Sequence, residues 1–286
     1  MKHNYLFLLL LGLTLSSCNL INPDEDVPAY IEVKEFSLST DPVIQGSSSS
    51  GITDAWIYVD GQLLGAFELP CRVPVLSSGN REVLIGAGIK INGLSATRAP
   101  YPFYRFYSAT ADLIPGESVS FSPEIAYFDS LIFPFISNFD DLSGNRFEAS
   151  GGSDTLIGLT SNPAEVFEGA GSLKASLLRD SGAVEFQMVD ALELPKQGTL
   201  VYLEFDYKCS HAFGVGLRSF YATSGTRTTS LINVFPSETW NKMYVNLTRA
   251  VSEQVNAVNY RIFFQSLKEP GSGPLNLYID NVKIVY

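Results

Sequence analysis

Four segments in the second half of the sequence alternate apolar side chains with polar or aromatic ones. These segments are residues 201–208, 215–220, 242–247 and 260–265. Successive side chains of a β-strand point to opposite faces, so each segment predicts a strand with one apolar face and one polar-aromatic face. Two sheets bury such apolar faces by packing them against each other. The second half is therefore predicted to be an antiparallel β-sandwich.

The first half also has the signature of β-strands. A period of two begins at Tyr30, and the β-forming run of residues 55–59 leads into Asp60-Gly61, a pair typical of a type I′ hairpin turn. Trp56 and Tyr58 share one face of this run, which we expect to be core rather than a binding patch. No segment here has helical spacing, so we expect an all-β protein.

Length and charge limit the organisation of the chain and its partners. The 286 residues exceed what one ordinary sandwich needs, which favours two domains. We expect an N-terminal β-sandwich over residues 30–128, a linker over 129–137 and a C-terminal β-sandwich over 138–286. Cys71 and Cys209 fall in different domains, so two buried free thiols are favoured over a disulfide. The formal net charge of −11 argues against nucleic acid as a partner.

The N-terminus has the features of an export signal. Lys2 precedes an apolar run from Tyr5 to Leu15, which is too short to span a membrane. The end of this run, Leu15-Ser16-Ser17-Cys18, resembles the lipobox of bacterial lipoproteins. The resemblance implies a signal peptide over residues 1–17, cleavage before Cys18, and a palmitate-type lipid anchor on Cys18 that holds the protein to a membrane. The alternative is an ordinary secretory signal that is cut near Ser17.

Residues 18–29 are predicted to form a short acidic tether. It contains Pro23, the run Asp24-Glu25-Asp26 and Pro28. The acidic run resembles the signal that routes some Gram-negative lipoproteins to the cell surface. That resemblance implies an outer-membrane lipoprotein exposed on the outside of the cell, and the alternative is a spacer that faces the periplasm.

The second half resembles the jelly roll of carbohydrate-binding modules, the galactose-binding-like sandwich. The residues that carry the resemblance are Asn138-Phe139-Asp140-Asp141, Gly171-Ser172-Leu173, Trp240 with Lys242, and Asp280-Asn281-Val282. The family often has a tryptophan where this chain has Phe147, which weakens the inference about the ligand more than that about the fold. The stretch from Trp56 to Ile91 resembles transthyretin-like or PEGA-like modules, which implies an Ig-like or transthyretin-like fold for the first domain.

The polar-aromatic faces of the predicted strands suggest a surface that binds glycan. Sugar rings stack on aromatic side chains, and their hydroxyls bond to charged and amide groups. The candidate ligand-binding residues, if their strands are neighbours, are Tyr202, Glu204, Asp206, Arg218, Phe220, Arg261, Phe263 and Gln265. The alternative is a solvated sheet face with ion pairs such as Glu204 with Arg218 or Arg261.

A structural calcium ion is the one candidate cofactor. Jelly rolls of the family often hold calcium near the opening acidic cluster and the aspartate of the last strand, which correspond to Asp140, Asp141 and Asp280. The alternative for Asp280 is a hydrogen bond to a turn or to the backbone. Zinc is disfavoured, because the mature chain has a single histidine, His211, and dispersed cysteines.

No catalytic motif is complete. The segment from Glu204 to Lys208 partly resembles the Glu-x-Asp-x-Glu strand of jelly-roll glucanases, but Lys208 replaces the second glutamate. We therefore expect no enzyme. The favoured function is a membrane-anchored envelope lipoprotein with a glycan-binding module. The alternatives are an assembly lipoprotein that binds other envelope or outer-membrane proteins and, least favoured, a glycan hydrolase.

Overall fold

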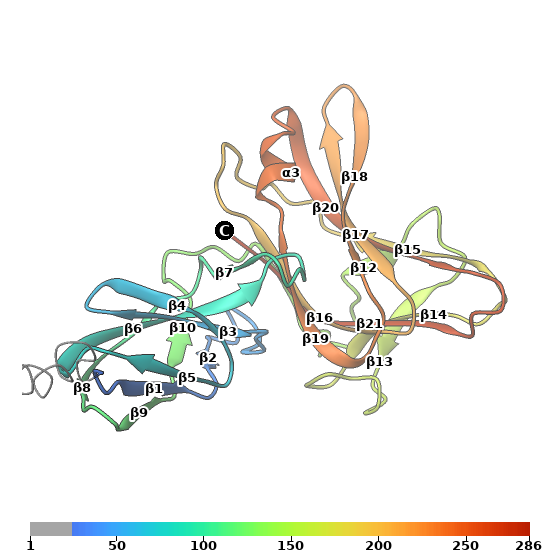
Figure 1. The fold of residues 1–286 in the computed structure, drawn as a ribbon. Helices are drawn as coiled ribbons and strands as arrows, with labels where there is room; N and C mark the ends of the chain where they lie inside the picture. Colours follow the sequence, from blue (N-terminus) through green and yellow to red (C-terminus); the bar gives the residue numbers. More distant parts are fainter. Residues whose placement is uncertain (1–24) are drawn as a thin grey trace, which may run out of the picture.

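The computed structural model describes residues 25–286, which form two lobes (Figure 1). The predictions on the signal peptide, Cys18 and Asp24 lie outside these residues. Across residues 25–286 the fold is all-β, with one short helix, α3 (Thr248–Ser252). Within the described residues, no helix is long and apolar enough to cross a membrane.

The N-terminal lobe, residues 29–126, contains three sheets. The largest has the order β4-β3-β6-β7, with β8 also paired to β6; the second is β5-β1-β9, and the third is β10-β2. The strands are β1 (Ala29–Val33), β2 (Ser37–Ser39), β3 (Asp54–Val59), β4 (Gln62–Glu68), β5 (Cys71–Val75), β6 (Gly79–Lys90), β7 (Arg98–Pro100), β8 (Tyr107–Leu113), β9 (Ser118–Phe121) and β10 (Glu124–Ala126).

The β3–β4 hairpin closes at the predicted turn. Asp60 and Gly61 both have positive φ, at 49° and 77°, as a type I′ turn requires. The alternation in β3 places Ala55 and Ile57 in the core, where both are fully buried. Trp56 is half-buried on the opposite, outer face of the sheet. The expectation that the face of Trp56 and Tyr58 is core is therefore wrong, because the small and β-branched neighbours fill the core instead.

The C-terminal lobe, residues 135–286, is a sandwich of two sheets. One has the order β13-β14-β21-β16-β19, with β11 also paired to β21, and the other has the order β12-β15-β20-β17-β18. The strands are β11 (Phe135–Ser137), β12 (Phe147–Ala149), β13 (Ile157–Thr160), β14 (Ser172–Leu177), β15 (Gly182–Met188), β16 (Tyr202–Cys209), β17 (Phe213–Tyr221), β18 (Gly225–Val234), β19 (Ser237–Asn246), β20 (Ala257–Lys268) and β21 (Leu275–Val285).

The predicted alternation fixes the core of this sandwich. Leu203 and Phe205 of β16 face Leu217 and Phe264 of the other sheet in one buried cluster. β21 lies inside its sheet, between β14 and β16. Residues 135–137, assigned to the linker from the sequence, form β11 beside β21. Cys71 and Cys209 are free thiols; Cys209 is buried, as expected, whereas Cys71 is only half-buried.

A third core lies where the two lobes meet. It joins aromatic and aliphatic side chains of the N-terminal lobe to three side chains of the C-terminal lobe, Tyr202, Tyr244 and Val285. Backbone bonds also cross this junction: Asn92 donates its N–H to the carbonyl of Tyr244 over 2.8 Å. The carboxyl end of β21 lies between the lobes (Figure 1). The lobes are therefore packed together rather than joined only by a linker.

Candidate functional site

The eight predicted ligand-binding residues lie on two different sheets. Each points away from the sandwich core, as the alternation requires, but the two sheets turn their outer faces in opposite directions. Tyr202, Glu204 and Asp206 are on β16 of one sheet, whereas the other five are on β17 and β20 of the second sheet: Arg218, Phe220, Arg261, Phe263 and Gln265. The prediction of a single shared face is therefore wrong for the three residues of β16.

The outer face of β16 is covered by the N-terminal lobe. Glu204 is fully buried, and its carboxylate accepts hydrogen bonds from the hydroxyl of Tyr101 at 2.7 Å and from that of Tyr127 at 2.9 Å and 3.0 Å. Tyr202 is 2% exposed, and its hydroxyl accepts a 3.0 Å bond from the Nδ2 of Asn246. These side chains hold the lobes together and are not open to a ligand.

A second polar group of the junction surrounds Asp206. Its carboxylate accepts hydrogen bonds from Ser49 Oγ at 2.8 Å and Asn281 Nδ2 at 3.0 Å, and it pairs with Lys242 Nζ at 3.4 Å. Lys283 donates to the carbonyl of Ser47 over 2.8 Å, and burial lowers its pKa to about 8. The alternative for this face, an ion pair of Glu204 with Arg218 or Arg261, is wrong, because both arginines lie on the other sheet.

The three aspartates proposed as calcium ligands make separate local bonds. Asp140 accepts the backbone N–H of Ala170 at 2.5 Å, and Asp141 accepts that of Ser143 at 3.0 Å. Asp280 accepts a 2.6 Å bond from Ser172 Oγ. Burial raises the pKa of Asp280 to about 7. Across residues 25–286, no group of three or more His, Cys, Asp or Glu side chains is placed to hold a metal ion, so calcium stays a prediction.

The outer face of the five-stranded sheet gathers the other five predicted residues, and we call it the arginine face. Arg218 of β17 lies directly opposite Arg261 of β20 in the strand register. Phe263 lies opposite Gly216 in the same way, and Gln265 lies opposite Gly214. Directly opposed residues of paired strands share a face, so the register brings these side chains together.

Each arginine of this face joins a carboxylate to an aromatic ring. Arg218 donates to Glu185 over 2.5 Å and to the amide oxygen of Gln187, and its guanidinium carbon lies 4.9 Å from the ring centre of Phe263. Arg261 repeats the pattern, with a 3.0 Å bond to Glu148 and a 5.6 Å approach to the ring of Phe220. These contacts fix both guanidinium groups before any ligand arrives.

Phe263 supports this face from below and is not an open stacking platform. It is 1% exposed, and its ring lies on the backbone of Gly216, where an added Cβ would come within 2.2 Å of the ring. The absence of a side chain at Gly216 therefore makes room for the Phe263 ring, and Arg218 covers that ring. The expectation of an exposed Phe263 is wrong, because alternation cannot show that a glycine opposite leaves room for the ring to lie flat.

A hollow of about 310 Å³ lies at one end of the arginine face. Its polar lining comes from Glu185, Asn233 and Gln265, and the backbone of Gly214 lies between them. A Cβ at Gly214 would meet Gln265 Cγ at 3.2 Å and Asn233 Oδ1 at 3.4 Å, so the missing side chain keeps the hollow open. Of these four residues the sequence singled out only Gln265. The period-two run of residues 182–188 was the signal that could have added Glu185.

Comparison with known proteins gives distant structural likenesses. No protein-family model matches the sequence, and no curated protein matches it. Similar solved structures include the xylan-binding domain from CBM 22, with 16% identity, 55% of this chain and 96% of that chain covered, and a TM-score of 0.39. The CBM22-2 xylan-binding domain of Paenibacillus barcinonensis Xyn10C is 16% identical, with 52% of this chain and 97% of that chain covered and a TM-score of 0.40. TmCBM61 in complex with β-1,4-galactotriose is 13% identical, with 51% of this chain and 92% of that chain covered and a TM-score of 0.33. These neighbours are carbohydrate-binding modules, at low identity.

Proposed function

We propose that the protein is a lipid-anchored envelope lipoprotein whose C-terminal lobe binds a glycan on the arginine face. The observation that carries the proposal is the hollow around Gly214, with a carboxylate and two amides converging above bare backbone. Carboxylate and amide groups accept and donate the hydrogen bonds that sugar hydroxyls offer. A floor without a side chain lets a flat sugar ring approach the sheet.

The electrostatic setting of Glu185 supports hydrogen bonding to hydroxyl groups. Burial opposes ionisation, but hydrogen bonds from Ser150 and Arg218 outweigh it and lower the pKa of Glu185. The carboxylate is therefore an acceptor at neutral pH. Because Arg218 already occupies one of its oxygens, Glu185 is held in place for a ligand hydroxyl at the other.

Burial of the strand that resembles a glucanase motif favours binding over hydrolysis. Glu204 and Asp206 would be the reacting carboxylates, yet both are at most 1% exposed and are bonded to residues of the N-terminal lobe. A glycan cannot reach them while the lobes are packed. Replacing Glu204 is thus expected to change the stability of the protein and to have no effect on any glycan-cleaving activity.

The test is glycan binding by the full-length protein in detergent, first on an array of neutral plant and microbial oligosaccharides and then by calorimetry on the hits. Gly214→Val fills the hollow, and Gln265→Ala removes an amide from its edge. Each is expected to weaken binding about tenfold or more, the usual effect of losing a central contact. Gly158→Val, on β13 of the other sheet with open space at its Cα, is the matched control. Unchanged affinity in Gly214→Val, or no hit on the array, overturns the proposal.

One surface favours the second candidate function, an assembly lipoprotein that binds other envelope proteins. Phe106 is 42% exposed beside the large sheet of the N-terminal lobe. Its ring packs edge-to-face against that of Tyr58, with 5.8 Å between the ring centres. Aromatic side chains in the open are typical of protein interfaces. Co-purification of an outer-membrane protein that is lost in Phe106→Ser, together with an empty glycan array, would select this function.

A further inference from the structure

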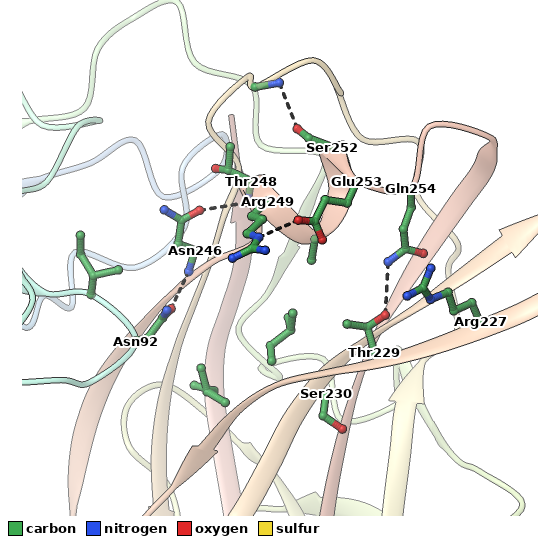
Figure 2. A pocket seen from close by; sticks show the side chains of 15 residues that line it. Asn92, Arg227, Thr229, Ser230, Asn246, Thr248, Arg249, Ser252, Glu253 and Gln254 are labelled. Atoms are coloured by element: carbon green, nitrogen blue, oxygen red, sulfur yellow. Dashed lines mark hydrogen bonds and ion pairs between the residues drawn. The ribbon is translucent and has the colours of Figure 1, made fainter.

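A larger cleft lies at the open end of the C-terminal sandwich, between β18 and the segment around α3 (Figure 2). Its volume is about 750 Å³, within the range of about 300–1,000 Å³ that ligand pockets span. Four separate parts of the chain line it: the β18 strand, the segment around α3, Gly198, and Ile91 with Asn92 from the N-terminal lobe. The cleft thus lies mainly in the C-terminal lobe, and the N-terminal lobe contributes two residues to its lining.

The side of β18 that lines the cleft follows from its register. Arg227 lies opposite Ser219 and Thr229 lies opposite Leu217, and both partners point into the core of the sandwich. Arg227 and Thr229 therefore project from the core-facing side of β18, beyond the end of the apolar core. Thr228, opposite Arg218, projects to the arginine face. The two sites are on opposite sides of the same sheet.

Hydrogen bonds hold the polar wall of this cleft in place. Gln254 is 4% exposed and donates to Thr229 Oγ1 over 3.3 Å. Asn246 donates its backbone N–H to Asn92 Oδ1 over 2.9 Å across the lobe junction, and its own side-chain oxygen accepts the N–H of Thr248 at 2.9 Å. These bonds, drawn in Figure 2, leave little rearrangement for a ligand to induce.

Arg227 is the charged group of the cleft that has no partner. Ten arginines lie in residues 25–286, and in this part of the chain nine of them have a carboxylate within 4.0 Å. Arg227 is the exception. Arg249, also in the lining, is paired with Glu253 at 2.6 Å. The lining thus carries a net charge of +1 on a protein with a net charge of −11.

The rest of the lining is neutral and suits a sugar ring. Hydroxyl and amide groups come from Thr229, Thr248 and Asn92, and apolar surface comes from Ile91, Leu231, Ile232 and Ala250. A ring with a hydroxyl-bearing edge and an apolar C–H face meets both kinds of surface. A small inorganic anion would occupy only a fraction of this volume, and a polyanion would find one unpaired positive charge.

We infer that this cleft binds a saccharide that carries a carboxylate, a uronic-acid-containing oligosaccharide, and that Arg227 takes the carboxylate. A guanidinium binds a carboxylate through two parallel N–H···O bonds, and such pairs are the stronger kind of hydrogen bond. The neutral groups of the lining bind the ring hydroxyls. This site is separate from the arginine face and does not depend on the function proposed for it.

The test compares acidic and neutral ligands by calorimetry with the full-length protein in detergent. The probes are oligomers of galacturonate, glucuronate and mannuronate and their neutral hexose counterparts. The protein is expected to bind at least one oligo-uronate about tenfold or more tightly than its neutral counterpart, and less tightly at high salt. Arg227→Gln is expected to bring the acidic ligand down to the affinity of the neutral one. Arg179→Gln, at another exposed arginine, is the control and should leave binding unchanged.

Three results would overturn the inference: no oligo-uronate binds, the neutral ligand binds the Gly214→Val variant as tightly as the acidic one does, or Arg227→Gln binds the acidic ligand as the wild type does. Gly214→Val separates the two sites. It is expected to remove neutral-glycan binding from the arginine face and to leave the uronate affinity unchanged. If Gly214→Val removes uronate binding instead, the acidic ligand belongs to the arginine face and the cleft is not its site.

Discussion

The hydroxyl of Tyr101 in the N-terminal lobe donates a 2.7 Å hydrogen bond to the carboxylate of Glu204 in the C-terminal lobe. Tyr127 donates to the same carboxylate, so one acidic side chain collects two donors from the opposite lobe. All three groups are buried. A buried acceptor that loses a donor has no water to replace it, so removing either hydroxyl should weaken the packing of the two lobes.

Removing either donor should destabilise the protein. Tyr101→Phe and Tyr127→Phe are each expected to lower the free energy of unfolding by about 1–3 kcal/mol, because a buried hydrogen bond to a carboxylate is lost without a change in packing. Urea unfolding gives the values, and double-mutant cycles with Glu204→Gln should give coupling energies above about 0.5 kcal/mol. Tyr58→Phe, on the outer face of β3, is the control and should cost close to nothing. Additive effects would mean that the residues act independently.

Asp280 should make stability fall as pH rises from about 4 to 7. Its pKa is raised from 3.8 to about 7, so its contribution is full below its ordinary pKa and is lost as pH rises through about 7. The pKa of Lys283 is lowered from 10.5 to about 8, so its contribution is full above 10.5 and is lost as pH falls through about 8. Together the two groups place a minimum of stability between about pH 7 and 8.

Asp280→Asn isolates the acidic limb of this profile. Relative to the wild type, the variant should lose the decline in unfolding free energy between about pH 4 and 7, measured by urea unfolding at each pH. Asp112→Asn changes an exposed carboxylate on β8 and should keep the wild-type slope. An identical pH profile in Asp280→Asn would show that the carboxyl is not perturbed by its burial.

Gly216 should resist even a methyl group. Gly216→Ala would place a Cβ 2.2 Å from the Phe263 ring and 2.7 Å from the carbonyl oxygen of Thr229, so we expect a cost of about 1–3 kcal/mol from overpacking. Gly158→Ala, in a strand with open space at the same position, should be neutral within about 0.5 kcal/mol. Equal melting temperatures for the two variants would contradict the position of the ring.

Cys18 and the acidic run of residues 24–26 lead to predictions about the localisation of the protein. If Cys18 carries the proposed lipid anchor, Cys18→Ser should abolish palmitate labelling and release the protein from the membrane fraction. Replacing Asp24, Glu25 and Asp26 by alanine should turn the protein from the cell surface to the periplasm. Protease shaving of intact cells measures this: the wild type should be cleaved and the variant protected. Protection of the wild type would assign it to the periplasmic side.

The sequence predicted the strands of the C-terminal lobe because their pattern reports the local geometry of the backbone. Val215, Leu217, Ile262 and Phe264 are all buried in the sandwich core, as their spacing requires. The pairing of Arg218 with Arg261 on one face also followed from alternation, once the two strands were taken as neighbours. The alternation of side chains along a strand depends on neither the loops nor the packing of the domains, so the folded protein retains the alternation that the sequence shows.

The covering of Glu204 could not be predicted in the same way. Alternation shows that Tyr202, Glu204 and Asp206 leave the sandwich core, but solvent and the surface of another lobe are equally compatible with that pattern. The tyrosines that cover this face, Tyr101 and Tyr127, lie about 75 to 105 residues away in sequence. The hollow depends on the missing side chain of Gly214, and the larger cleft combines segments that are distant in sequence, which explains why Gly214 and Arg227 were not found.

The position of β21 sets the order in which the protein can be made. This strand lies inside its sheet, paired to β11, β14 and β16, and it ends at Val285. The six-stranded sheet therefore cannot assemble on the ribosome until residue 285 has been synthesised and has left the exit tunnel, whereas the N-terminal lobe is complete by residue 126. Folding of the larger lobe therefore waits for nearly all of its own strands, whereas the smaller lobe can fold while the rest of the chain is still being made.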